Sequence, residues 1–254
     1  MAIVKWNLKG KLALITGGTK GIGLAIVNEF LSLGADVVII ARNQDEFNLD
    51  VEKWQQKGQQ VRLVIADLTD HHHYQNLIAD LGLDKIDILV NNVGGNFPKP
   101  FIDYSLEDIH QIFNLNLFSV IRLTQLLFEP LKAANGAVVI NISSIAGFED
   151  VGTGSMYAVA KAALIQLTKS LSVEWARHHI RVNSVAPWFT STNRINTLLQ
   201  DEELQDYVIS NTPMNRIASP NEIANAVAFL AMASSSYITG ETIKVDGGFS
   251  ANAK

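Results

Sequence analysis

The sequence predicts an α/β protein in which a seven-stranded parallel sheet carries helices on both faces. Short runs rich in Val, Ile and Leu alternate with helix-length segments along all 254 residues. Several of these runs are apolar throughout, which is typical of strands buried on both faces of a parallel sheet. The regular alternation of strand and helix indicates right-handed βαβ units and a doubly wound sheet. No internal repeat, low-complexity tract or linker interrupts the pattern, so residues 1–254 are interpreted as one domain.

The expected elements follow one another in a regular order. The apolar runs predict strands at residues 12–16, 36–41, 61–66, 86–91, 137–143, 180–186 and 242–245. The segments between them predict helices at residues 21–33, 44–57, 70–82, 106–132, 155–177 and 220–233. Residues 191–211 are a polar insertion whose apolar residues recur at helical spacing (Ile195, Leu198, Leu199, Leu204 and Val208). We therefore expect the segment 191–216 to be a lid over a substrate.

Composition and charge exclude several classes of function. The net charge is −5 and no Lys/Arg run stands out, so neither nucleic acid nor an anionic membrane surface is expected as a partner. The absence of cysteine excludes disulfides, thiolate metal sites and a cysteine nucleophile. The histidines at 71–73 are consecutive at a helix start, so they do not converge on one ion, and no metal is expected. The N-terminal apolar run is too short for a signal peptide, and no stretch approaches the roughly 18 apolar residues of a membrane span, so a cytoplasmic protein is expected.

The first strand is followed by the glycine-rich turn "TGGTKGIG" (16–23), which opens the first helix. Glycine lets the backbone approach a pyrophosphate, and the helix N-terminus offers unpaired N–H groups and partial positive charge. The spacing differs from G-x-G-x-x-G, and no Gly-Lys-Ser/Thr follows as in a P-loop. A turn without a ligand is the alternative, but the strand before and the helix after favour a Rossmann-type dinucleotide site. Its expected contacts are Gly17, Thr19, Lys20, Gly21, Ile22 and Gly23.

The second strand ends in "IIARN", where an acidic residue usually meets the free 2′-hydroxyl of NAD. No acid stands at Ile40 or Ala41, and Arg42 follows. Arg42 and Lys20 could both reach a 2′-phosphate, although each could also be a solvated surface cation. Together with the missing acid, they favour NADP(H) over NAD(H) as the cofactor.

Polar residues and glycines also follow the third and fourth strands. Asp67 and Leu68 fall where an adenine edge would lie, whereas Asp70 is suited to cap the next helix. The fourth strand ends in "NNVGG", where Gly94 lets the chain pass under a ribose. Asn91 could contact the cofactor or could equally brace the sheet from inside. Ligands of such sheets bind at the carboxyl ends of the strands, so these positions complete the expected cofactor site.

A candidate reacting centre follows the fifth strand. Tyr157 and Lys161 are four residues apart, so they share one face of the predicted helix. A tyrosine with an ordinary pKa of about 10 is a poor acid or base at neutral pH, but a nearby cation lowers that pKa. Lys161 is placed to do so, and Ser144 could hold a carbonyl oxygen toward Tyr157. Because Y-x-x-x-K is common on surface helices, it indicates a reacting centre only in combination with the preceding strand, the serine and the dinucleotide loop.

Several motifs occur together along the chain. They are T-G-x-x-x-G-x-G (16–23), N-N-x-G (91–94), an Asn in "NLNLFS", a Ser thirteen residues before the Tyr, Y-x-x-x-K (157–161) and the C-terminal "ITGETIKVDGGFS". This combination resembles the short-chain dehydrogenase/reductase family over essentially the whole chain. Segments such as "WNLKGKLALITGG" and "VEWARHHIRVN" are most similar to the tropinone-reductase-like branch. The resemblance also implies a homo-oligomer, either a tetramer or a dimer.

The resemblance implies a catalytic site of four residues. Tyr157 would be the general acid in reduction and the base in oxidation. Lys161 would lower the pKa of Tyr157 and bind the nicotinamide ribose. Ser144 would orient the substrate carbonyl, since its spacing to Tyr157 selects it over Ser143. Asn116 would hold a water that links Lys161 to solvent.

The loop "VAPWFTST" (185–192) departs from the family pattern P-G-x-x-x-T. Pro187 and Thr192 match it, and the resemblance implies that the backbone near Thr190 and the Thr192 hydroxyl contact the nicotinamide carboxamide. Trp188 replaces the usual Gly, so we expect it to shape the substrate pocket unless its ring packs outward under the lid. Glu149 is a further candidate substrate residue, which could attract a cationic amine or be a solvated loop acid.

Three functional hypotheses follow. The leading one is an NADP(H)-dependent oxidoreductase acting on a ketone or secondary alcohol, such as a tropinone-like cyclic ketone. A 3-oxoacyl thioester reductase is the alternative, whose carrier would need a cationic docking surface; Lys99, Arg194 and Arg216 are scattered candidates. A non-catalytic dinucleotide sensor on the same fold is the third. The complete catalytic set favours an enzyme, because a sensor has no need of it.

Overall fold

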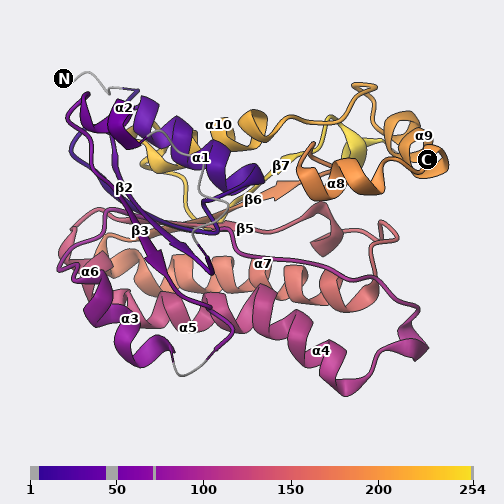
Figure 1. Ribbon diagram of the computed structural model, residues 1–254, viewed down its shortest axis with the longest axis horizontal. Helices are drawn as coiled ribbons and strands as arrows, with labels where there is room; N and C mark the ends of the chain where they lie inside the picture. Colours follow the sequence, from indigo (N-terminus) through magenta and orange to yellow (C-terminus); the bar gives the residue numbers. More distant parts are fainter. Residues whose placement is uncertain (1–5, 44–50, 71–72, 253–254) are drawn as a thin grey trace.

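The computed structural model describes residues 6–43, 51–70 and 73–252. Within these residues, seven parallel strands form one sheet in the order β3-β2-β1-β4-β5-β6-β7 (Figure 1). The predicted α/β fold class and the doubly wound topology are thereby confirmed. The strands are β1 Leu12–Thr16, β2 Asp36–Ala41, β3 Val61–Ile65, β4 Ile88–Asn91, β5 Val138–Ile142, β6 Arg181–Pro187 and β7 Thr242–Val245.

Helices cover both faces of the sheet (Figure 1). Helices α1 and α10 pack on one face, where their buried side chains join those of β1, β2 and β5. Side chains of α3, α5, α6 and α7 build the core on the other face. The described helices are α1 Gly21–Ser32, α2 Val51–Gln55, α3 His73–Leu81, α4 Leu106–Phe113, α5 Ser119–Leu126, α6 Phe128–Ala133, α7 Ser155–Trp175, α8 Asn193–Leu198, α9 Glu202–Asn211 and α10 Pro220–Ala231.

Most expected boundaries agree with the structure, but the long helix expected at 106–132 is interrupted. It consists of α4, a π-helical turn at Asn114–Phe118, α5 and, after Leu127, α6. Asn116 lies in the π-helical turn, and its side-chain amide donates to the carbonyl of Ile112 at 2.8 Å. The side chain thus takes the acceptor that the backbone N–H of Asn116 would use in an α-helix. The first part of the helix expected at 44–57 lies outside the described residues.

The order of the chain in the sheet reverses at β1, which pairs with β2 on one side and β4 on the other. In sheets of this kind, ligands bind in the crevice beyond the carboxyl ends of the strands at such a point. The segments that leave this edge are the glycine turn after β1 and the segments that follow β4, β5 and β6. The fold therefore gathers most of the expected site residues at one edge.

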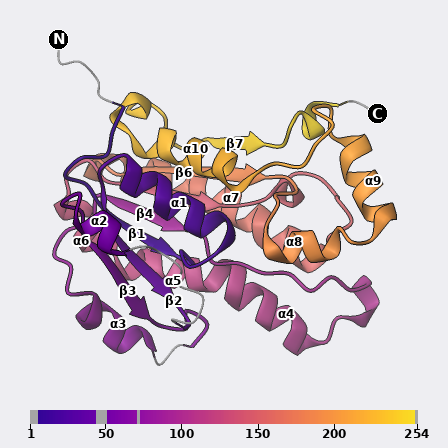
Figure 2. The same ribbon diagram turned by 45° about the horizontal axis from the view of Figure 1, so that its top comes forward.

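The insertion after β6 forms α8 and α9, which lie beyond the carboxyl end of that strand (Figure 2). Its two ends are joined at the base. The N–H of Ser191 donates to the carbonyl of Ala218 at 2.8 Å, and the N–H of Ala218 donates to the carbonyl of Phe189 at 3.2 Å. The residues at the two ends of the insertion are therefore hydrogen-bonded to each other. Its movement as a lid stays a prediction.

Two further observations concern membranes and metals. No helix in the described part of the chain combines the length and the apolar content that a membrane crossing requires. Over residues 6–43, 51–70 and 73–252, no three His, Cys, Asp or Glu side chains gather into a metal-binding cluster. Two of the three consecutive histidines, His71 and His72, lie outside these ranges.

Candidate active site

The glycine turn after β1 is shaped by close backbone approaches. Gly17 and Gly21 have φ angles of +66° and +55°, a region that favours glycine. A Cβ atom on Gly23 would lie 2.0 Å from the carbonyl oxygen of Gly17, so only glycine fits there. Helix α1 begins after Lys20 with no side-chain cap and no acidic residue in its first turn. This combination suits the pyrophosphate of a dinucleotide, which the helix N–H groups and dipole would attract.

Two residues that the sequence interpretation missed tie this turn to the segment after β4. The Thr16 hydroxyl accepts from the backbone N–H of Asn92 at 2.9 Å and from that of Val93 at 3.1 Å. The Asn92 side chain donates to the carbonyls of Thr16 at 3.0 Å and Gly17 at 3.1 Å. The N-N motif gave a signal for Asn92, but its partner lies 76 residues away in sequence. Sequence spacing alone therefore could not identify the pair.

Asn91 braces the sheet from inside. It is buried, and its side-chain amide donates to the Thr124 hydroxyl at 3.1 Å and to the Asn141 side chain at 2.9 Å. The bracing role is therefore present in the structure. A contact between Asn91 and a cofactor stays a prediction.

The other expected cofactor residues lie at the carboxyl ends of β1, β2 and β3. Arg42 and Lys20 are both exposed there, and the described end of β2 contains no acid. The Asp67 carboxylate accepts from the backbone N–H and the hydroxyl of Thr69 at 2.8 and 2.7 Å. The Leu68 side chain is buried in the core. Adenine contacts of Asp67 and Leu68 stay predictions.

Ser144 and Tyr157 are brought together, whereas Ser143 is directed elsewhere. The Ser143 hydroxyl donates to the carbonyl of Val185 at 3.1 Å and accepts from the Ser184 hydroxyl at 2.7 Å. The Ser144 hydroxyl accepts from the backbone N–H of Ala146 at 3.2 Å, and its side chain lies close enough to Tyr157 to lower the pKa of the phenol. The geometry therefore leaves Ser144 as the serine that can meet a substrate beside Tyr157.

Lys161 and Asn116 converge beside Gly94. The Lys161 ammonium donates to the carbonyl of Ile142 at 2.9 Å. The Asn116 side chain donates to the carbonyl of Gly95 at 2.8 Å and accepts from the Gly95 N–H at 3.2 Å. A Cβ atom on Gly94 would lie 3.0 Å from Oδ1 of Asn116 and 3.2 Å from Nζ of Lys161. The two polar groups thus face the same space, as a proton relay requires.

The pKa of Tyr157 shifts in the direction opposite to the one expected. Burial raises this pKa, while the hydrogen bond with Ser144 and the positive charge of Arg194 lower it in part. Nζ of Lys161 lies 5.6 Å from the centroid of the Tyr157 ring and bonds to a backbone carbonyl instead. Burial also lowers the pKa of Lys161 to about 8. Burial is thus the largest influence on the pKa of Tyr157, and Arg194 is the cation that lowers it in part, while an effect of Lys161 on this pKa stays a prediction.

The loop after β6 lies against the glycine turn. Pro187 ends β6, and the buried Thr190 hydroxyl donates to the carbonyl of Trp188 at 3.0 Å. The Thr192 hydroxyl caps the N-terminus of α8. Cγ2 of Thr192 lies 3.2 Å from the position that a Cβ atom on Gly21 would occupy. The residues expected at the nicotinamide thus share one short segment, and their contacts with it stay predictions.

Trp188 is buried in a small apolar cluster beside Tyr157. Ile145 belongs to this cluster and Tyr157 packs against it. The indole ring stacks on Phe249 with 3.8 Å between ring centroids. Its Nε1 donates to the Thr212 hydroxyl at 3.1 Å. The ring therefore packs inward, where it fastens the end of the insertion and the C-terminal segment to the wall of the site.

Glu149 already has a cationic partner. Its carboxylate lies 3.5 Å from Nζ of Lys244, and this ammonium lies 4.6 Å from the centroid of the Phe148 ring. A role for Glu149 in attracting a substrate amine stays a prediction, and it would require this pair to open.

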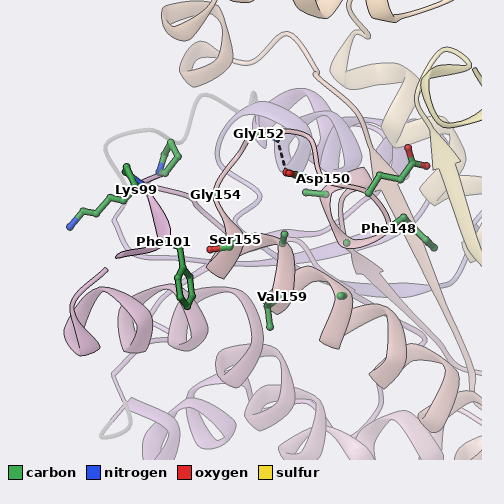
Figure 3. Close-up of a pocket in the computed structure, with 15 residues that line it drawn as sticks. Lys99, Phe101, Phe148, Asp150, Gly152, Gly154, Ser155 and Val159 are labelled. Carbon is green, nitrogen blue, oxygen red and sulfur yellow. Dashed lines mark hydrogen bonds between the residues drawn. The ribbon is translucent and has the colours of Figure 1, made fainter. Parts of the chain in front are cut away.

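A groove of about 750 Å³ lies beside the N-terminal half of α7 (Figure 3). Phe101 and Lys99 line one side of it, and Phe148, Asp150 and Val159 lie on the others. Its lining does not include the side chains of the expected catalytic set. The groove therefore borders the expected catalytic set, since Ala158 and Ala162 follow Tyr157 and Lys161 directly, but it is not lined by those side chains.

Known proteins share this architecture. A family described as Enoyl-(Acyl carrier protein) reductase matches residues 17–250. A tropinone reductase homologue from Arabidopsis thaliana is 42% identical over 98% of this chain and 95% of its own length. A gluconate 5-dehydrogenase from Burkholderia cenocepacia, solved with NADP and tartrate, has a TM-score of 0.92 at 30% identity, over 100% of both chains. A 7α-hydroxysteroid dehydrogenase, solved with NADH and 7-oxo glycochenodeoxycholic acid, has a TM-score of 0.88 at 35% identity, over 96% of this chain and 95% of its own.

Proposed function

The chain belongs to the short-chain dehydrogenase/reductase family, and from that premise we propose that it is an NADP(H)-dependent oxidoreductase of ketones and secondary alcohols. A tropinone-like cyclic ketone is the first candidate substrate, because the curated relatives include tropinone reductase homologues. The observation that carries the proposal is the convergence of four side chains at the carboxyl edge of the sheet, next to the glycine turn. These are Asn116, Ser144, Tyr157 and Lys161.

Each of these side chains has a separate task in the proposed reaction. A bound nicotinamide supplies the hydride in reduction and accepts it in oxidation. Ser144 holds the substrate oxygen by a hydrogen bond, and Tyr157 donates its proton to that oxygen in reduction. The raised pKa of Tyr157 keeps the phenol protonated at neutral pH, as a proton donor must be. Lys161 and Asn116 face the space through which a new proton reaches Tyr157.

The preference for NADP(H) rests on charge. Arg42 and Lys20 are exposed at the carboxyl ends of β2 and β1, and neither Ile40 nor Ala41 is acidic. A guanidinium and an ammonium suit a 2′-phosphate, whereas a free 2′-hydroxyl usually meets a carboxylate. The similar enzymes were solved with NADP in one case and NADH in the other, so likeness alone does not choose the cofactor. The charges of this chain support NADP(H).

A 3-oxoacyl thioester reductase is the second candidate. The description of the matching family supports an acyl-carrier thioester as substrate, although it names reduction of an enoyl group and not of a 3-oxo group. The docking of an acidic carrier would need several cations at the mouth of the site. Lys99 pairs with Asp108 at 2.7 Å, and Arg216 pairs with Glu222 at 2.6 Å. Two of the three candidate cations are thus engaged by carboxylates of this chain, which supports a small-molecule ketone instead.

We also propose a homo-oligomer, a dimer or a tetramer, in the cytoplasm. Exposed apolar side chains along the outer helices support self-association; they include Leu106, Phe118, Val159 and Val173. The location rests on composition alone, and one relative from Arabidopsis thaliana is described as chloroplastic.

The test is the consumption of NADPH and NADH with cyclic, bicyclic and β-keto substrates, including tropinone and a 3-oxoacyl thioester. We expect turnover of a ketone with a higher kcat/KM for NADPH than for NADH. Tyr157→Phe should lower kcat by at least about 100-fold, because general acid catalysis typically contributes that much. Tyr237→Phe, which changes a fully exposed tyrosine, is the matched control and should keep wild-type activity.

Two outcomes would contradict the proposal. Equal turnover by wild type and Tyr157→Phe would refute the mechanism. NADPH binding measured by calorimetry, without turnover of any substrate in the panel, would favour the sensor hypothesis.

A further inference from the structure

Arg194 places a cation at the mouth of the reacting centre. It is the second residue of α8, and its side chain is exposed. A Cβ atom on Gly95 would lie 3.5 Å from Nη1 of Arg194, and Gly95 exchanges two hydrogen bonds with Asn116. The charge of Arg194 also reaches Tyr157, whose pKa it lowers. The guanidinium therefore lies between the insertion and the catalytic residues.

Other cations around the site are engaged by carboxylates of the chain itself. Arg216 donates to both carboxylate oxygens of Glu222, at 2.8 and 2.6 Å, and Lys99 and Lys244 have acidic partners as well. Among the described residues, none gives Arg194 a hydrogen bond or an ion pair. A guanidinium presents five N–H donors in a fork that matches a carboxylate. A free fork that faces a reacting centre suits an anion brought by a ligand.

We propose that Arg194 binds an anionic group of the substrate, a carboxylate or its equivalent, so that the substrate is a keto acid or the corresponding hydroxy acid. A keto acid thereby replaces the tropinone-like ketone as the first candidate, because a cationic amine would be repelled by the guanidinium. The inference rests on the proposed oxidoreductase function. The substrate carbonyl lies at Ser144 and Tyr157, while its anionic group is held by α8. One substrate thereby joins the insertion to the sheet edge and closes the site.

The pyrophosphate of the cofactor is the other anion that could meet this side chain. Its expected place is the glycine turn, and the insertion residue next to Gly21 is Thr192. Arg194 instead meets the segment after β4, beside Asn116. Because that segment also borders Lys161, the guanidinium lies at the reacting end of the site and not at the phosphate end.

The test compares 3-, 4- and 5-oxo acids with their methyl esters, which have the same ketone but no charge. The ratio of kcat/KM for acid and ester is measured with NADPH for wild type, Arg194→Gln and Arg194→Lys. We expect wild type to prefer one acid over its ester, and Arg194→Gln to reduce this ratio by about 10- to 100-fold, as loss of a charge-assisted hydrogen bond would. Arg194→Lys should restore part of it. Since any change in the pKa of Tyr157 affects acid and ester alike, the ratio isolates the contact with the carboxylate.

Arg177→Gln is the control, since it removes the same charge from an exposed side chain at the far end of α7, and it should leave the ratio unchanged. An unchanged ratio in Arg194→Gln would overturn the inference. A raised KM for NADPH with an unchanged ratio would assign Arg194 to the cofactor, which also overturns it. If no ketone is reduced, the proposed function fails. The binding of the oxo acids to NADP⁺-loaded wild type and Arg194→Gln, measured by calorimetry, then tests the role of Arg194 without turnover. Equal affinities of the two proteins would contradict that role.

Discussion

At the scale of single residues, the chemistry of a side chain depends on what it faces. Ser143 and Ser144 are neighbours, yet the first hydroxyl bonds inside the sheet and the second meets Tyr157. Lys161 and Arg194 are both cations near Tyr157, but Lys161 donates to a backbone carbonyl while the charge of Arg194 lowers the pKa of the phenol. Residue type alone would have assigned these roles differently.

Trp188 should determine substrate preference, because its ring forms part of the wall beside Tyr157. Trp188→Gly opens space in this wall, so it should change the relative kcat/KM values over a panel of ketones more than the KM for NADPH. The loss of so large a buried side chain should also destabilise the protein by about 3–5 kcal/mol. Steady-state kinetics over the panel and urea denaturation measure the two effects.

Trp188→Phe distinguishes a change in the shape of the substrate pocket from a general loss of stability. A phenyl ring can keep the stacking on Phe249 but lacks the N–H that donates to Thr212. We expect this variant to keep most of the wild-type preference with a smaller loss of stability. Relative activities in Trp188→Gly that match those of wild type would contradict a role for Trp188 in the pocket.

Sequence spacing could identify the residues of the site that are close along the chain. Ser144, Tyr157 and Lys161 lie within eighteen residues of one another and within one strand–turn–helix unit, so spacing reflects their geometry. Arg194 lies on α8, in the insertion that follows β6, and its distance from Tyr157 depends on how the insertion folds back. The burial that raises the pKa of Tyr157 is likewise a property of the assembled site.

At the scale of the elements, an acidic residue joins the amino ends of β1 and β4. Asp87 is only 3% exposed and precedes β4. It accepts from the backbone N–H of Leu12 at 3.1 Å and pairs with Lys11 at 3.0 Å and Lys85 at 3.3 Å. Burial alone would raise the pKa of Asp87, but the hydrogen bonds and charge of these partners outweigh it and hold the pKa below its usual value.

Asp87→Asn should therefore destabilise the fold by at least about 1.5 kcal/mol at neutral pH, because a buried, charge-assisted network loses its charge. The folded carboxyl has the lower pKa, so the unfolded state binds more protons as the pH falls. The stabilisation is complete above the unfolded pKa of about 4 and is lost as the pH falls through the folded pKa. Urea denaturation of both proteins over a pH series measures this difference.

The matched control is Asp84→Asn, which changes an exposed carboxylate three residues away. It should leave the free energy of unfolding within about 0.5 kcal/mol of wild type. A difference between wild type and Asp87→Asn that persists unchanged to low pH would show that the carboxylate charge is not responsible.

Element boundaries could be predicted where the hydrophobic pattern changes sharply, as it does at β1, β2 and β7. The interruption of the helix expected at 106–132 could not, because apolar residues continue through it. The π-helical turn depends on the Asn116 amide, which bonds to Ile112 on its own helix and to Gly95 after β4. A contact between two elements thus decides the local structure, and only the folded chain contains it.

At the scale of the whole molecule, the sheet separates two kinds of surface. Its carboxyl edge gathers the polar residues of the candidate site, whereas the outer faces of α4, the π-helical turn and α7 carry large exposed apolar side chains. The parallel sheet and its helical layers could be predicted from the alternation of strands and helices. The sequence could not distinguish the apolar residues of the outer face from those of the core, because both recur with helical periodicity.

This outer face should be buried between copies of the chain. Val159 and Val173 are 49% and 80% exposed and fourteen residues apart, close to four turns of α7, so they share one face of the helix. Light scattering coupled to gel filtration should give wild type the mass of a dimer or a tetramer. Val159→Glu with Val173→Glu places charges in the expected interface and should lower that mass while leaving the far-ultraviolet circular dichroism unchanged.

The control is Ile65→Glu, which adds a charge at an exposed apolar position of the edge strand β3 and should keep the wild-type mass. A wild-type monomer, or an unchanged mass in the double variant, would exclude this face as the interface, since two buried glutamates without partners would cost several kcal/mol.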